Sequence, residues 1–389
     1  MPAPITLTIE DIQEMISSVL LAEMDFQKRL NHTSGGRLDA DFIPAAATVG
    51  KPEKTIARIA RQFGLKNAQL ITGLTVRDMA EQIISETGGR PEILTFFTSG
   101  STGEPVPAPS AFADLEQEVH ALAKLFPDRK KIISLVPRHH IYGFLFSILL
   151  PKALDIPVSC KAVLPSTDLI DNLKSGDLII AFPLLWSKLE TLELDFPANV
   201  CGVTSTGPCP AAVINSLRAK GLTRMTEVYG SSETGGVGYR HNPADFYTLM
   251  DHWKKLGNQS LIRSSSKKSE PVIYELQDSF KWQNSNHFTP LRRRDKAVQV
   301  AGINIYPSKV ENFFNSLPQV ESCSVRLMTH GEGDRLKIFI VPASDFNPAA
   351  LESELRGAAS LSLTPHEQPK AYTFGSALPA SGMGKLTDW

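Results

Sequence analysis

Hydrophobic positions recur at helical spacing in the first ninety residues of the chain. Ile12, Met15 and Val19 follow one another at intervals of three or four, and the same spacing returns over residues 76–84. Side chains on one face of an α-helix repeat with this period. Thr75 has the side chain of a helix N-cap, directly before the second series. We therefore expect residues 1–90 to form a helical region.

A different pattern follows over residues 91–294, where short apolar runs alternate with helical stretches. The apolar runs predict five buried strands, at Ile93–Phe97, Ile132–Val136, Leu178–Phe182, Val200–Thr204 and Met225–Tyr229. Helices are expected between them at 111–126, 141–153, 184–194 and 210–220. This alternation predicts an α/β sheet with crossover helices. Loops that bind ligands are then expected at the carboxyl ends of the strands.

The last part of the chain predicts a smaller α+β unit. Its pattern gives helices near 308–317 and 348–358, with strands near 320–327, 336–342 and 370–374. The sequence thus predicts three parts: a helical region at 1–90, a large α/β domain at 91–294, and a small domain at 296–389.

Composition narrows the classes of function. The 389 residues carry a formal net charge of -1, which argues against a nucleic-acid binder. The four cysteines have no CxxC spacing and are typical of reduced, mostly buried thiols, so we expect a cytoplasmic protein. The first residues lack the pattern of a signal peptide. The apolar run at 141–154 is too short to span a membrane and predicts a buried helix.

A loop rich in glycine and hydroxyl groups follows the first predicted strand, from Thr98 to Gly103. Glycines let a backbone approach a phosphate closely, and hydroxyls and amides donate to its oxygens. The loop is not a Walker A motif, because no Gly-Lys-Ser/Thr sequence follows it. Taken alone, such loops are common turns.

Four further segments occur downstream of this loop in a fixed order. They are Pro137–Gly143, Tyr229–Glu233, Arg293-Arg294-Asp295 leading into Gly302–Pro307, and Pro379–Lys385. In this order the five motifs resemble those of the adenylate-forming superfamily, which includes acyl-CoA synthetases, aryl-acid ligases and the adenylation domains of peptide synthetases. The resemblance runs from about residue 91 to the last residue. It implies a large nucleotide-binding α/β domain and a small, mobile C-terminal domain.

The resemblance assigns the first motif to the β- and γ-phosphates of ATP. The loop residues with this expected role are Thr98, Ser99, Gly100, Ser101, Thr102 and Gly103. Val106 stands where the family has a lysine, so one phosphate contact is missing. This departure, together with Arg292 in place of a family glycine, keeps a degenerate nucleotide-binding protein open as an alternative.

The resemblance also assigns the nucleotide and acid contacts. His140 holds the position of a histidine beside the carboxylate substrate and the nucleotide, although a lone histidine is more often structural. The turn Thr206-Gly207-Pro208 presents backbone to the adenine and borders the acid pocket. The expected nucleotide contacts at the end of the fifth strand are Tyr229, Gly230, Ser231 and Ser232, with Tyr229 stacked on adenine and Ser232 at the α-phosphate.

Charged residues complete the expected site. Glu233 would ligate Mg²⁺, a metal that prefers oxygen ligands. Asp278 would bind the ribose hydroxyls, and Arg293 follows it at the family's fifteen-residue spacing. Asp295 would be the hinge between the two domains. Lys385 would bridge the substrate carboxylate and the nucleotide, where a cation offsets the repulsion between a carboxylate and the α-phosphate.

These assignments imply an ATP-dependent ligase. A carboxylic acid, aryl or medium-chain, would form an acyl-adenylate and then a thioester on CoA or on the phosphopantetheine of a carrier protein. The helical region at 1–90 is much shorter than the N-terminal region usual in the family. A second alternative is therefore a non-catalytic partner in a biosynthetic pathway that uses this region for docking.

Overall fold

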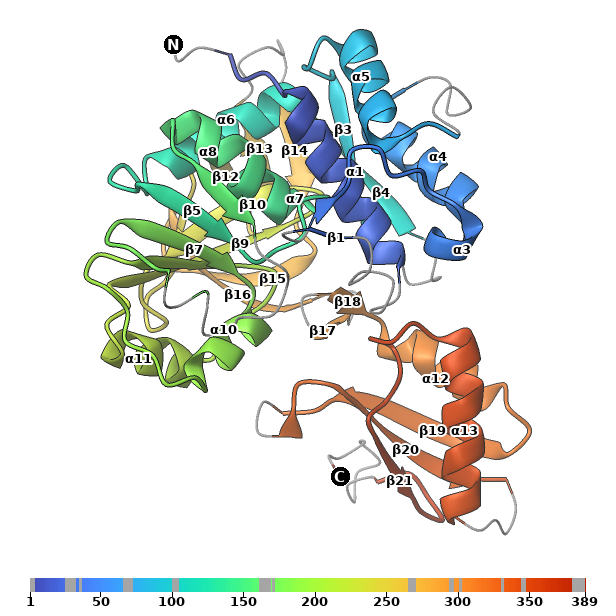
Figure 1. Cartoon of the computed structure of the whole chain (residues 1–389). Helices are drawn as coiled ribbons and strands as arrows, with labels where there is room; N and C mark the ends of the chain where they lie inside the picture. The colour runs from blue at the N-terminus through green and yellow to red at the C-terminus, as the bar shows by residue number, and fades with distance from the viewer. Residues whose placement is uncertain are drawn as a thin grey trace. The chain divides into compact units, whose positions relative to one another are not determined.

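A computed structural model describes most of the chain. The described residues are 4–24, 33–34, 37–65, 73–99, 105–160, 169, 172–264, 271–293, 297–300, 303–329, 332–343, 348–379 and 389. The chain forms two compact units (Figure 1). The first unit comprises Met1–Phe97, Pro107–Leu276 and Phe280–Pro290, and the second comprises Thr98–Val106, Gln277–Ser279 and Leu291–Trp389.

The first unit begins with the expected helical region. Its helices are α1 (Ile9–Glu23), α3 (Ala46–Val49), α4 (Pro52–Gln62) and α5 (Val76–Thr87), joined by the short strands β1 (Thr33–Ser34) and β2 (Arg37–Leu38). Thr75 caps α5, as the sequence predicts, and Asp78 completes a capping box with it. Thr8 and Asp11 cap α1 in the same way. Each box satisfies two backbone donors at a helix start, which fixes where the helix begins.

A nine-stranded mixed sheet is the centre of the first unit. Its strand order is β15-β16-β11-β10-β9-β8-β7-β5-β6. The parallel part consists of β5 (Lys131–Ser134), β6 (Val158–Cys160), β7 (Asp177–Ala181), β8 (Cys201–Thr204) and β9 (Arg224–Ser231). The remaining strands are β10 (Gly235–Arg240), β11 (Tyr247–Leu249), β15 (Asp278–Trp282) and β16 (His287–Arg293), of which β10, β11 and β16 pair antiparallel.

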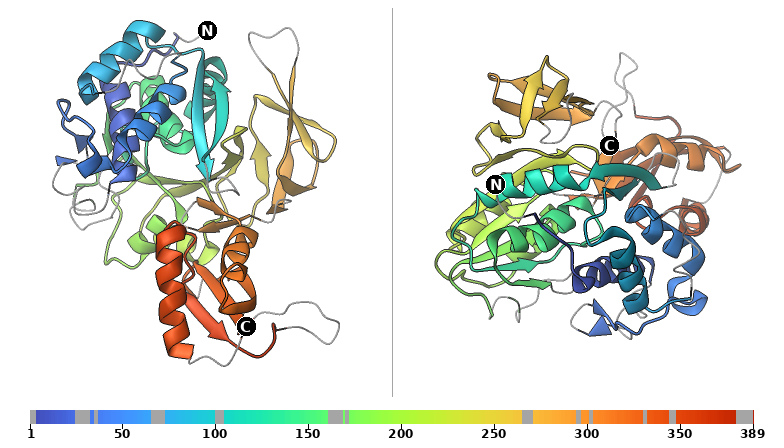
Figure 2. Two further views of the ribbon diagram at one scale, coloured as in Figure 1. Left: turned by 90° about the vertical axis from the view of Figure 1, so that its right-hand side faces the viewer. Right: turned by 90° about the horizontal axis from the view of Figure 1, so that it is seen from above.

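Helices cover both faces of the parallel part (Figures 1 and 2). One face carries α6 (Phe112–Ala123) and the continuous run of α7 (Ile141–Phe144), the π-helix η2 (Leu145–Leu149) and α8 (Leu150–Leu154). The opposite face carries α10 (Pro183–Glu190) and α11 (Ala211–Ala219). Neighbouring strand residues point to opposite faces, so Ile132 joins the first core and Ile133 the second.

Two features differ from the pattern expected of the sequence. The strand β3 (Ile93–Ser99) pairs with β4 (Pro105–Ala111) in a separate two-stranded sheet, although its apolar run predicted a member of the large sheet. The sequence also gave no sign of the antiparallel strands or of the three-stranded sheet β12 (Trp253–Leu256), β13 (Ser260–Arg263) and β14 (Val272–Glu275). The strands of the three-stranded sheet are short and partly exposed, so their hydrophobic periodicity is weak. Strand β10 is mostly buried, but three of its six residues are glycines, which obscure the pattern of a strand.

The second unit has the α+β composition expected of residues 296–389. Its elements are β17 (Val298–Val300), β18 (Ile303–Ile305), α12 (Pro307–Asn315), β19 (Val320–Leu327), β20 (Leu336–Pro342), α13 (Pro348–Ser362) and β21 (Ala371–Phe374). Strand β20 is central, antiparallel to β19 and parallel to β21. In the described part of either unit, no helix has the length and apolar character needed to cross a membrane.

Candidate active site

Three of the expected motifs meet at one edge of the sheet in the first unit. Because β5, β8 and β9 run parallel, the segments after them emerge on the same side. His140 lies beyond β5, Thr206 follows β8, and Tyr229 lies near the end of β9. Two hydrogen bonds tie these segments together. The Tyr142 hydroxyl is 3.0 Å from the Val203 carbonyl oxygen, and the Ser205 hydroxyl is 2.8 Å from that of Val228.

His140 is the N-cap residue of α7 and is exposed. The surrounding protein and the Arg58 guanidinium lower the pKa of its imidazole to about 4. Because the side chain is exposed, removal from water contributes less than it would at a buried site. Removal from water and the positive charge of Arg58 both disfavour the protonated imidazole, so His140 is neutral near pH 7. Its neighbour His139 is buried, with a pKa held well below the ordinary value by burial, by His140 and by Arg58. A neutral, accessible imidazole at this edge of the sheet can donate or accept one hydrogen bond without adding charge.

The turn after β8 has an unusual backbone. Thr206 has a φ of 76°, in the left-handed region that β-branched residues rarely adopt. Its Oγ1 is buried and makes no hydrogen bond to the described residues. Strained backbone of this kind is retained where the surroundings determine it, often at ligand sites. The finding agrees with a turn that presents backbone to a ligand.

Tyr229 lies in a cluster of aromatic rings. Its ring makes edge contacts with Tyr247 at 5.8 Å, Phe280 at 5.6 Å and Phe288 at 5.7 Å between centroids. Edge-to-face pairs of this geometry are attractive and orient the ring. Tyr229 is half-buried, so a fixed ring remains partly accessible, as stacking on a base requires.

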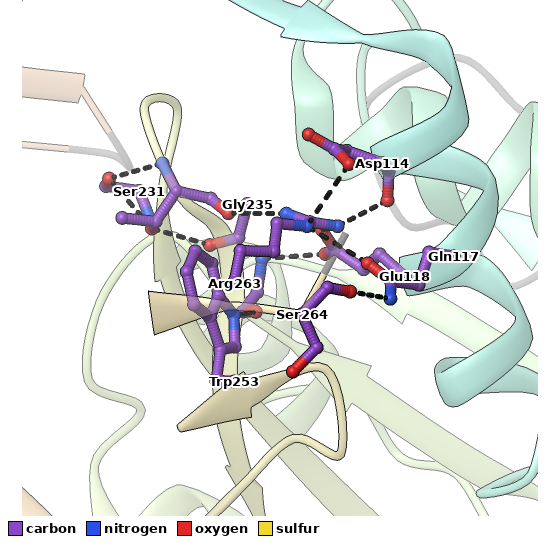
Figure 3. Close-up of polar contacts among 10 residues, drawn as sticks. Asp114, Gln117, Glu118, Ser231, Gly235, Trp253, Arg263 and Ser264 are labelled. Atoms are coloured by element: carbon purple, nitrogen blue, oxygen red, sulfur yellow. Dashed lines mark hydrogen bonds and ion pairs between the residues drawn. The ribbon is translucent and has the colours of Figure 1, made fainter. Parts of the chain in front are cut away.

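Glu233 lies on the turn between β9 and β10, and a polar network supports this turn (Figure 3). The buried carboxylate of Glu118 on α6 accepts a hydrogen bond from the Gly236 N–H at 2.6 Å. Arg263 donates to the Thr234 carbonyl at 3.4 Å and lies 3.7 Å from an Asp114 oxygen. The turn is therefore held from α6 and from β13.

Gly235 shows how closely the turn approaches Glu118. A Cβ at this position would lie 2.2 Å from a Glu118 oxygen, and the φ of Gly235 is 70°. A side chain here would require both a clash and a strained backbone. Trp253 completes the support, donating from its indole N–H to the Gly236 carbonyl at 2.8 Å, while Arg263 lies over its ring at 5.2 Å.

A small pocket in the first unit is lined by residues of both the His140 segment and the turn that carries Glu233. Glu233 and Ile141, the residue after His140, both line it. The other lining residues are Pro109, Ser110, Asp114, Leu115, Glu118, Thr234, Gly235, Arg263 and Tyr274. Glu233 is exposed, and no hydrogen bond or ion pair joins its carboxylate to the residues that the structure describes. An oxygen ligand is thus available at the pocket, as a phosphate-bound Mg²⁺ would need.

Gly207, Pro208, Gly230, Ser231 and Ser232 lie in the first unit with the residues above. The remaining expected site residues belong to the second unit. Asp278 begins β15, Thr98 and Ser99 end β3, and Arg293 is the last residue of β16. Gly100, Ser101, Thr102, Gly103, Asp295 and Lys385 lie outside the described residues. Their assignments stay predictions.

Sequence reasoning missed the residues that support the turn. Glu118 and Arg263 lie outside the motifs, and the sequence around each gives no sign that it differs from an ordinary charged residue of a helix or strand. A partly buried ion pair between Arg240 and Glu227, 2.6 Å apart, was missed for the same reason. The Arg240 guanidinium also lies over the Tyr247 ring, 4.6 Å from its centroid. No sequence signal distinguishes these charges from solvated ones.

Comparison with known proteins adds the decisive observation. No family model matches the chain. It is 37% identical over 300 residues to a 4-coumarate–CoA ligase of Cereibacter sphaeroides, covering 76% of this chain and 70% of the relative. A 4-coumarate–CoA ligase of Halorhodospira halophila is 36% identical over 322 residues, which make up 82% of this chain and 81% of that one. The chain belongs to the adenylate-forming superfamily.

Within this superfamily the chain is an acid–thiol ligase. The fold agrees. The structure of the amide bond synthetase McbA from Marinactinospora thermotolerans matches 97% of this chain and 92% of its own, with a TM-score of 0.63 at 13% identity. The nearly equal coverage in the Halorhodospira comparison means that the two ligases have similar lengths.

Proposed function

We propose that this ligase activates a hydroxylated aryl acid of the 4-coumarate type and transfers the aryl-acyl group to CoA. The observation that carries the proposal is the 36–38% identity to three 4-coumarate–CoA ligases over 76–82% of the chain. The carboxylate oxygen attacks the α-phosphorus of ATP, and pyrophosphate leaves. The thiol sulfur of CoA then attacks the carbonyl carbon of the aryl-adenylate, its proton is lost, and AMP leaves.

Each expected site residue has its own role in this proposal. Glu233 would hold Mg²⁺, which fits because its exposed carboxylate is available at the pocket. When bound, Mg²⁺ supplies charge neutralisation on the phosphates. His140 borders the acid as a neutral hydrogen-bonding group, Tyr229 stacks on adenine, and the Thr206 turn lies between base and acid. In the second unit, Asp278 binds the ribose and Lys385 offsets the charge of the attacking carboxylate.

An acid panel tests the proposal. Thioester formation is followed with ATP, Mg²⁺ and CoA for 4-coumarate, cinnamate, benzoate and octanoate. We expect the highest kcat/KM for 4-coumarate and a loss of turnover when Mg²⁺ is chelated. A preference for octanoate over all aryl acids would contradict the proposed substrate class. Pyrophosphate release without thioester, restored by a carrier protein, would contradict CoA as the acceptor.

A further inference from the structure

The segment that carries His140 is held by two helices of the N-terminal region, from outside the large sheet. Residues 135–140 connect β5 to α7, and residues 137–140 of this connection are here called the His140 loop. The Ser18 hydroxyl on α1 accepts from the Arg138 N–H at 3.0 Å and lies 2.8 Å from His139 Nδ1. One side chain thus contacts two successive residues of the loop.

A second helix contacts the same loop. Gln62, the last residue of α4, donates from its amide to the His139 carbonyl at 3.1 Å, and Gln62 is 1% exposed. The Arg138 side chain forms an ion pair with Glu14 on α1 and donates from Nε to the Cys160 sulfur at 3.0 Å. The Arg138 N–H and the His139 carbonyl are therefore both satisfied by residues more than 75 positions away.

These contacts act on His140 through its buried neighbour His139. His139 is buried, and its ring centroid lies 4.1 Å from that of His140, so the two rings pack directly against each other. Buried backbone groups without partners are costly, so the loop keeps the conformation in which Ser18 and Gln62 reach it. Gly143 allows helix α7 to approach the start of the loop closely, since a Cβ there would lie 2.0 Å from the Pro137 carbonyl oxygen.

We propose that Ser18 and Gln62 are positioning residues for His140, and that the N-terminal helices α1 and α4 thereby shape the acid-binding side of the active site. The inference rests on the proposed function, because it gives His140 a place beside the acid. It assigns the helical region a part in recognition of the acid. Neither residue touches substrate in this account; both act through the His140 loop.

The chain offers a matched control one residue away. Ser17 is also on α1 and is 2% exposed, but its hydroxyl makes no hydrogen bond to the described residues. Ser17→Ala and Ser18→Ala remove the same atom from the same helix. Ser18→Thr keeps the hydroxyl, and Gln62→Met keeps the length of the side chain while removing the donor.

Steady-state kinetics of the full-length chain test the inference. Ser18→Ala should lower kcat/KM for the best acid of the panel about tenfold, because it leaves two polar groups of the loop unpaired. KM for ATP should change by less than about twofold, a split that a general loss of stability would not produce. Gln62→Met should act like Ser18→Ala, Ser18→Thr should recover most of the loss, and Ser17→Ala should match wild type.

Two outcomes would overturn the inference. One is Ser18→Ala and Gln62→Met variants that fold and keep the wild-type kcat/KM for the acid. The other is a Ser18→Ala or Gln62→Met variant in which kcat/KM falls equally for the acid and for ATP. The imidazole NMR signals of His140 give a readout that needs no turnover: they should move in Ser18→Ala and stay in Ser17→Ala. A wild type inactive on every acid would refute the proposed function, while these signals would still decide the positioning role.

Discussion

Glu233 combines exposure of its carboxylate with a turn whose backbone is fixed on both sides. Ser231 N–H donates to Thr234 Oγ1 at 3.2 Å inside the turn, and Glu118 and Arg263 hold the residues that follow. A ligand for a metal needs such a combination, because the oxygen must be free while its position is set in advance. The charge of Glu233 is thus available to a cation at the pocket.

Glu233→Gln should abolish most of the adenylation. The amide keeps the shape of the side chain but removes the negative charge, so the rate of pyrophosphate release should fall by at least about a hundredfold. The fall should be partly recovered at high Mg²⁺ concentration. Glu193→Gln, which changes another exposed glutamate of the same unit, is the control and should behave like wild type. Pyrophosphate release within about twofold of wild type would contradict the assignment of Glu233 as a metal ligand.

At this scale the motifs are visible in the sequence and their supports are not. His140, Tyr229 and Glu233 could be named because they occur in ordered segments of recognisable composition. Ser18 and Gln62 meet the His140 loop from 121 and 77 positions away, and Glu118 meets Gly236 from 118. Such pairs depend on how helices pack on the sheet, which single-residue chemistry does not specify.

At the scale of elements, helix α6 carries two glutamates in opposite environments. Burial raises the pKa of Glu118 to about 7, although Arg263 and the Gly236 N–H act against it. Glu116 is partly buried too, but hydrogen bonds from Arg90 and the Ile5 N–H lower its pKa below the ordinary value. The same helix therefore stabilises the fold differently at low and at neutral pH.

The two glutamates should change the pH dependence of stability in opposite directions. Native Glu118 binds its proton more tightly than the unfolded chain does, so its contribution to the free energy of unfolding falls as pH rises from about 4.5 to about 7. Glu118→Gln should remove this fall. Glu116→Gln should instead remove a loss of stability on acidification below about pH 4.5. Urea denaturation across this range measures both, and curves parallel to wild type for Glu118→Gln would contradict its raised pKa.

The elements themselves were predictable where their pattern is strong. The strands β5, β7, β8 and β9 and the helices between them follow from apolar runs and helical spacing, because parallel strands are buried on both faces. The strand β3 has an equally apolar run yet lies in another sheet. Hydrophobicity predicts that a strand is buried and leaves its neighbours undetermined.

At the scale of the molecule, the chain divides into two compact units. The second unit contains the expected hinge residue Asp295 and the expected Lys385. The proposed reaction has two steps with different needs. In the proposed mechanism, adenylation would need Lys385 beside the carboxylate, and thiol transfer would need access for CoA. Domain rotation about Asp295 would meet both needs, because a hinge motion can change which groups complete an active site.

Lys385→Ala and Asp295→Pro should separate the two steps. The first should lower adenylation by about a hundredfold and leave transfer from a presynthesised aryl-adenylate nearly unchanged. The second should spare adenylation and suppress transfer, since proline fixes φ at the hinge. Lys370→Ala, at an exposed lysine of the same unit, is the control. If both variants lose both half-reactions equally, rotation about Asp295 is wrong for this chain.

The central claim is that the acid is activated as an adenylate, and oxygen transfer tests it most directly. The enzyme is incubated with 4-coumarate labelled with ¹⁸O in the carboxylate, together with ATP, Mg²⁺ and CoA, and the products are analysed by mass spectrometry. Attack of the carboxylate on the α-phosphorus predicts one ¹⁸O atom in each AMP formed, with unlabelled pyrophosphate. Label in inorganic phosphate, or thioester formation with unlabelled AMP, would contradict the account.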